Sequence, residues 1–145
     1  MRSVYSAGLI VMVTIVATAD ARAQSLKLRQ IEAQAEVELA QEVEYTNKVC
    51  ESNLTVKFDW TAVPESELGK YSASGYCKNG PLGGIRRTCD DSAGKDAVKK
   101  KIRSVTCGFG PTRSIELKDG VIDYKINFES SNDTDFVFEY LQNHL

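Results

Sequence analysis

The chain has 145 residues, 18 of them basic and 20 acidic, which gives a formal net charge of −2 at pH 7. Hydrophobic residues make up 42% and charged residues 26%, a balance that excludes the composition of an intrinsically disordered chain. The length suits one domain with a core of its own, and a net charge this close to zero does not favour nucleic acid as the partner.

The first 23 residues have the pattern of a secretory signal peptide. Arg2 supplies a positive start, residues 7–19 are apolar, and the tripeptide Ala-Arg-Ala ending at Ala23 is a small-residue cleavage site. An uncleaved N-terminal anchor is the alternative, but the apolar run is shorter than the about 20 residues that a membrane span needs. We therefore expect an exported protein, periplasmic or secreted, whose mature chain starts at Gln24 and has no transmembrane segment.

Residues 24–50 predict an amphipathic helix, followed by a single α+β domain over residues 51–145. The stretch from Ser25 to Lys48 contains neither proline nor glycine and is rich in good helix formers. Its apolar residues recur every four positions, which places them in one stripe along an otherwise acidic helix. They are Ile31, Ala35, Leu39 and Val43. The helix either packs on the domain or forms an arm that binds a partner or self-associates.

All four cysteines follow the predicted cleavage site, at Cys50, Cys77, Cys89 and Cys107. An even number in an exported protein predicts two disulfide bonds. Their spacing contains no Cys-x-x-Cys pair and His144 is the only histidine, so we expect no metal site and no cofactor. Three pairings are possible, and we favour Cys50–Cys77 with Cys89–Cys107, since each would close a loop of about 20–30 residues.

Three strands are predicted in the second half of the chain, near 103–109, 113–118 and 121–128. The last two are joined by Asp119-Gly120, a strong signal for a two-residue hairpin turn. That turn places Leu117 opposite Ile122 and gives the hairpin one apolar face. Its members are Ile115, Leu117, Ile122, Tyr124, Ile126 and Phe128.

The remaining segments complete an α+β prediction. Residues 54–60 alternate between apolar and polar side chains and form a fourth strand, which ends at Trp60. Residues 71–91 are helical but contain Pro81 and several glycines, so the helix either begins at Pro81 or is kinked there. Further helices are expected over 93–102 and near the C-terminus. We predict a largely antiparallel sheet of three or four strands covered by helices.

Two acidic side chains are the only catalytic candidates. Glu116 and Asp123 face each other across the hairpin, with Cβ atoms about 5 Å apart. Carboxylates this close raise the pKa of one of them, as acid–base catalysis and retaining glycosidases require. The pair lies on the polar face, however, where the other interpretation is a solvated surface balanced by Lys118 and Lys125.

A basic segment is the candidate binding site. Between Lys78 and Arg103 the side chains sum to a charge of +5. The candidate residues are Arg86, Arg87, Lys95, Lys99, Lys100, Lys101 and Arg103. Such a cluster can dock an anionic polymer or an acidic protein surface. The alternative is that these residues form the solvated faces of two helices.

The sequence thus favours a small exported, disulfide-containing domain that acts as a non-catalytic binding module of the cell envelope. Its partner would be an envelope protein or an anionic polymer; nucleic acid is disfavoured, because no aromatic residues are interleaved with the basic ones for base stacking. The alternatives are a small hydrolase that uses Glu116 and Asp123, and an assembly component that self-associates through the helix over 24–50.

Overall fold

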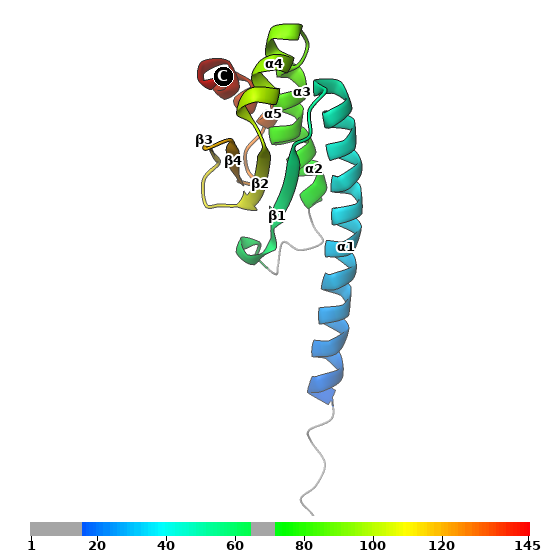
Figure 1. Cartoon of the computed structure of the whole chain (residues 1–145). Helices are drawn as coiled ribbons and strands as arrows, with labels where there is room; N and C mark the ends of the chain where they lie inside the picture. The colour runs from blue at the N-terminus through cyan, green and yellow to red at the C-terminus, as the bar shows by residue number, and fades with distance from the viewer. Residues whose placement is uncertain (1–15, 65–71) are drawn as a thin grey trace, which may run out of the picture.

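The structure, a computed structural model, describes residues 16–64 and 72–145. Residues 1–15 of the predicted signal peptide therefore lie outside the described part of the chain. A four-stranded sheet with helices along it forms the body of the protein (Figure 1). The strands are β1 (Thr55–Asp59), β2 (Ser104–Phe109), β3 (Ser114–Lys118) and β4 (Val121–Ile126), in the spatial order β1-β2-β4-β3.

The sheet is mixed, so the predicted largely antiparallel arrangement is wrong. Only β3 and β4 are antiparallel; β1 runs parallel to β2, and β2 runs parallel to β4. The order follows from burial. Ile122, Tyr124 and Ile126 of β4 are fully buried and need a central position beside β2. Ile115 and Leu117 of β3 are only half-buried, which suits an edge strand.

The predicted hairpin is confirmed in turn and register. Asp119 and Gly120 both have positive φ, 48° and 76°, as a type I′ turn requires. Leu117 is opposite Ile122 and Glu116 is opposite Asp123. The apolar face of the hairpin points to the helices, as expected, and its residues belong to the hydrophobic core or pack against it.

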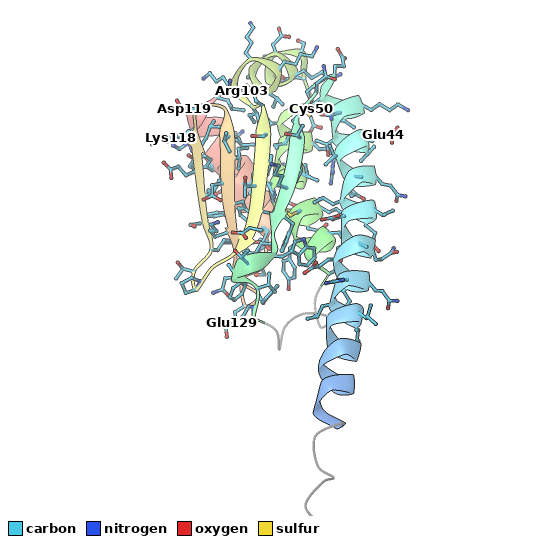
Figure 2. The ribbon with its side chains drawn as sticks, turned by 60° about the horizontal axis from the view of Figure 1, so that its bottom comes forward. Glu44, Cys50, Arg103, Lys118, Asp119 and Glu129 are labelled. Carbon is cyan, nitrogen blue, oxygen red and sulfur yellow. A yellow bond between two sulfur atoms is a disulfide. The ribbon has the colours of Figure 1, made fainter. Side chains whose placement is uncertain are left out.

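The helices cover this apolar face of the sheet and leave the other face open (Figure 2). They are α1 (Val16–Cys50), α2 (Ala73–Cys77), α3 (Gly83–Thr88), α4 (Ser92–Lys101) and α5 (Asp133–His144). A 3₁₀ turn, η1 (Trp60–Ala62), follows β1. The open face carries alternate residues of each strand, such as Lys57, Thr106 and Asp123, which is the polar half of the strand pattern.

The helical segment predicted over residues 71–91 is kinked. A π-helical turn, η2 (Lys78–Leu82), joins α2 to α3, and the kink falls at Gly80, whose φ and ψ are −92° and −106°. Pro81 follows inside the turn, where it removes one main-chain donor and prevents a regular helix. Just beyond, Gly84 lets α3 approach α5 closely, because a Cβ there would lie 2.5 Å from a methyl carbon of Val137. This close contact lets α3 and α5 pack directly against each other.

Helix α1 is both docked and projecting. Its C-terminal half packs on the domain through Leu39, which is buried, and Val43, which is half-buried. The N-terminal half extends away from the domain (Figure 1). The two side chains Leu26 and Val37 remain 59% and 56% exposed. The packing of the helix on the domain is therefore confined to its C-terminal half.

Both predicted disulfide bonds are present, but the favoured pairing is wrong. Cys50 is bonded to Cys89, and Cys77 is bonded to Cys107. Cys50 ends α1 and Cys89 lies just after α3, so the first bond joins the ends of two adjacent helices. Cys107 lies in the middle of β2 on the covered face, and the second bond joins the sheet to α2. The central position of β2, which was not predicted, brings Cys107 to Cys77 of α2 and not to Cys89.

Candidate anion-binding cleft

The seven predicted basic residues divide into those that brace the fold and those that surround a cleft. Arg86 belongs to the first group. Its Nη1 donates to Oγ1 of Thr46 at 2.9 Å and contacts a carboxylate oxygen of Glu42 at 3.3 Å, and its Nη2 donates to the main-chain oxygen of Lys78 at 3.1 Å. With its guanidinium occupied on three sides, Arg86 joins α3 to α1 and is not available to a ligand.

Three further basic residues are paired with carboxylates. Arg87 forms an ion pair with Asp135 of α5, and its guanidinium lies over the ring of Phe138 at 4.2 Å. Lys95 and Lys99 contact the two oxygens of Glu51 at 3.0 and 3.1 Å. Hydrogen bonds from Lys95 and then Lys99 hold the pKa of Glu51 below its ordinary value. These pairs neutralise charge at the surface.

The remaining three, Lys100, Lys101 and Arg103, line a shallow cleft of about 520 Å³. It forms where the end of α4 and the start of β2 meet the β3–β4 turn and the end of α5. The other residues around it are Leu117, Asp119, Gly120 and His144. Arg103 and Asp119 lie near each other at this end of the sheet (Figure 2). Three cations and one carboxylate leave the lining positive.

The tight turn shapes the cleft. The main-chain nitrogen of Arg103 donates to the oxygen of Gly120 at 2.7 Å, and the Nη2 of Arg103 donates to the main-chain oxygen of Asp119. The guanidinium is thereby held against the hairpin turn. Since an arginine has five N–H donors, these contacts leave others for a ligand.

The two lysines differ in their contacts. Lys101 Nζ donates to the main-chain oxygens of Leu145 and, at 3.4 Å, His144. Lys100 is exposed and forms no hydrogen bond or ion pair with any residue that the structure describes. The ring of His144 stacks on Tyr140 with centroids 3.8 Å apart, while its Nδ1 is 2.7 Å from the oxygen of Tyr140. This orients His144 at the rim of the cleft.

Such an arrangement can bind an anion. Two ammonium groups and a guanidinium within one shallow hollow suit a phosphate, sulfate or carboxylate group. His144, Asp119 and Gly120 were missed as parts of this site. No local pattern indicated them, because only the fold brings α5 and the hairpin turn to the end of α4.

The catalytic candidates are elsewhere. Glu116 and Asp123 are directly opposed across the hairpin, as predicted, but on the open face of the sheet, and neither lines the basic cleft. Asp123 contacts the ammonium of Lys125 at 3.1 Å. The contact with Lys125 agrees with the charge balance of the alternative interpretation, although this Oδ1 is itself buried and accepts no hydrogen bond from any described residue.

No group of three or more histidine, cysteine, aspartate or glutamate side chains within residues 16–64 and 72–145 is arranged to hold a metal ion. In the same part of the chain, no helix has both the length and the apolar character that a membrane crossing requires. Comparison with known protein families, with curated proteins and with solved structures finds no match.

Proposed function

We propose that the protein is an exported, non-catalytic binding module of the cell envelope, and that it holds an anionic group of its partner in the cleft around Lys100, Lys101 and Arg103. The observation that supports this most directly is the charge of the cleft lining, in which the three cations Lys100, Lys101 and Arg103 outnumber the side-chain carboxylate of Asp119 and the Leu145 oxygen that Lys101 contacts. Of the seven basic candidates, these three are the ones not matched to an acidic side chain.

Export is supported by the disulfide bonds and the leader pattern. Two buried disulfide bonds are typical of proteins that fold in an oxidising compartment. The leader over residues 1–23 adds the pattern of a cleaved secretory signal. The partner would then be an envelope protein with an acidic surface, or an anionic envelope polymer.

Charge reversal in the cleft tests the proposal. The double variant K100E/K101E should reduce binding to polyglutamate or inorganic polyphosphate at least tenfold, measured by isothermal titration calorimetry at 50 mM salt. It should also reduce retention of the protein on an isolated envelope fraction. Binding should weaken as the salt concentration rises, because the contacts are between exposed charges.

The matched control is K27E/R29E, which changes the net charge by the same amount on the projecting half of α1. This control should bind like the unaltered protein. Equal losses in both variants would indicate a nonspecific effect of net charge, and no loss in K100E/K101E would contradict the proposal.

An exposed apolar side of α1 favours a second function, self-assembly. Leu26 and Val37 are exposed and eleven residues apart, which is about three helical turns and places both on one side of the helix. The double variant L26E/V37E should change the mass measured by light scattering if this surface holds copies of the chain together. A monomeric mass both for the unaltered protein and for the variant would exclude that function.

A further inference from the structure

The outer edge of the sheet at β1 is the feature that the proposed function leaves unexplained. β1 pairs only with β2 and is one of the two edge strands. Edge strands expose a row of main-chain donors and acceptors that can pair with another chain. Helix α1 runs beside this edge, so that the edge borders a groove and not open solvent.

Main-chain groups alternate in direction along β1. The nitrogen of Thr55 donates to the oxygen of Arg103 at 3.1 Å, so the main-chain groups of Thr55 face β2. Because the direction reverses at every residue, those of Leu54, Val56 and Phe58 face outward.

A side-chain amide occupies the first outward position. Asn47 of α1 accepts from the main-chain nitrogen of Leu54 at 2.9 Å through Oδ1, and donates to its oxygen at 3.0 Å through Nδ2. Ser52 fixes the orientation of this amide, since its hydroxyl donates to the same Oδ1 at 2.9 Å. Asn47 thus makes the two hydrogen bonds that one residue of an adjacent antiparallel strand would make.

The next two outward positions are open. Among the described residues, no strand or side chain pairs with the outward main-chain groups of Val56 and Phe58. They border a groove of about 630 Å³ between β1 and α1, a volume in the range of ligand sites. Most of its lining is apolar, with Leu39, Val43, Leu54, Val56 and Phe58 the largest side chains.

We propose that this groove binds an extended segment of a partner protein, which adds to the sheet as a fifth strand beside β1 and continues the pairing that Asn47 begins at Leu54. The free donors and acceptors of Val56 and Phe58 hold its main chain. Alternate side chains of the segment enter the apolar space between β1 and α1, and the side chains between them lie on the open face. This is recognition by strand addition, in which main-chain bonds supply affinity and alternate pockets supply selectivity.

Charge complementarity indicates which side chains of the added segment would lie on the open face of the sheet. Lys57 lies between Val56 and Phe58 and points to the open face, where a directly adjacent side chain on an added strand would be its neighbour. An acidic residue at that position is favoured. The occupant is therefore a segment in which apolar residues alternate with at least one carboxylate.

A synthetic heptapeptide of alternating valine and glutamate, blocked at both ends, is the probe. Its binding is followed by the fluorescence of Trp60, the only tryptophan, whose ring lies 4.5 Å from that of Phe58. We expect saturable binding and, by NMR, slowed hydrogen exchange at the amides of Val56 and Phe58. A heptapeptide of alternating serine and glutamate, which lacks the apolar side chains, should bind at least tenfold more weakly.

Two N-methylated forms of the peptide separate strand addition from simple apolar contact. One is methylated at the amides of the valines and the other at the amides of the glutamates, so each loses the donors along one edge only. One form should bind like the parent and the other at least tenfold more weakly; which one fails reports the direction of the added strand. Equal binding by both forms, or no binding of the parent peptide at 1 mM, would overturn the proposal.

On the protein side, Val56→Pro removes one outward donor, and proline is tolerated where the N–H of an edge strand faces outward. The matched control Val56→Ala shortens the same side chain and keeps the donor. Binding should fall at least tenfold in V56P and remain within about threefold in V56A. If the protein is a dimer that V56P dissociates, the groove belongs to a second copy and the assignment to a partner protein is wrong.

Discussion

Tyr124 Oη donates a hydrogen bond of 2.6 Å to Oδ1 of Asp133, and this bond ties the centre of the sheet to the first turn of α5. The ring of Tyr124 is fully buried at the middle of β4. Asp133 also contacts the Nη1 of Arg113 at 3.1 Å, so its carboxylate has a cationic partner at the edge of the core. A buried hydroxyl and a shielded ion pair thus share one oxygen atom.

This relationship predicts how stability depends on alkaline pH. Burial, and then the hydrogen bond to Asp133, raise the pKa of Tyr124 far above its ordinary value of 10.0. The unfolded chain releases the phenolic proton above pH 10 while the folded chain retains it. The contribution of Tyr124 to stability is therefore complete below pH 10 and falls by about 1.4 kcal/mol for each further pH unit.

Urea unfolding at pH 9, 10 and 11 measures this effect, with Tyr124→Phe as the comparison. The variant should be less stable at pH 9 by about 1–3 kcal/mol, because Asp133 loses a hydrogen-bond donor. The difference between the two proteins should then narrow as the pH rises, since phenylalanine does not titrate. Parallel curves for the two proteins would show that Tyr124 is not buried as described.

Replacing Asn47 should loosen the sheet at β1. Asn47→Ala removes both hydrogen bonds to the main chain of Leu54, and should lower the free energy of unfolding by about 1–3 kcal/mol. Asn47→Asp keeps the acceptor but not the donor, so its loss should be smaller. Urea unfolding gives the energies, and hydrogen exchange at the amide of Leu54 shows whether the strand end has opened. Unchanged exchange in both variants would contradict the assigned role of Asn47.

Removal of one disulfide bond should lower the free energy of unfolding and leave the other bond intact. The Cys50–Cys89 bond joins residues 39 positions apart, and the loop-entropy relation then gives about 4 kcal/mol for the double variant C50S/C89S. Protease digestion without reduction, followed by mass spectrometry, checks the pairing directly. Peptides that link Cys50 to Cys77 would contradict the structure. In C50S/C89S the Cys77–Cys107 bond should still form, because it joins different elements.

The opposed carboxylates should give opposite effects on stability. Glu116→Gln removes a like-charge contact across the hairpin and should stabilise the protein by a few tenths of a kcal/mol. Asp123→Asn relieves the same like-charge contact but loses the closer one with Lys125 at 3.1 Å, so the net change should be a destabilisation of less than about 1 kcal/mol. Urea unfolding measures both. A turnover that disappears in both variants would instead support the hydrolase alternative.

Local features of the fold were predictable from the sequence. The turn at Asp119-Gly120 and the register of β3 on β4 follow from turn chemistry and the two-residue period of strands. Such signals act between residues close in the chain, where few alternative pairings compete. The kink near Pro81 was predictable as one of two options for the same reason.

Long-range arrangement was not predictable in the same way. β2 lies beside β4 and not beside β3. The residues of β2 do not indicate this, because the sequence of a strand does not specify which strand pairs with it. The disulfide pairing and the basic cleft both depend on that order and on the positions of α3 and α5. Asn47 carried no recognisable signal either, since asparagine near the end of a helix is common and its partner Leu54 lies beyond the turn.

The way in which α1 ends has a mechanical consequence. Cys50 is the last residue of the helix, and two covalent connections leave it. The main chain continues to β1, and the disulfide bond leads to Cys89 at the C-terminal end of α3. A pull on the outer end of the arm is therefore shared between two branches. The strand beside the groove is shielded from tension that would otherwise shear it from its neighbour.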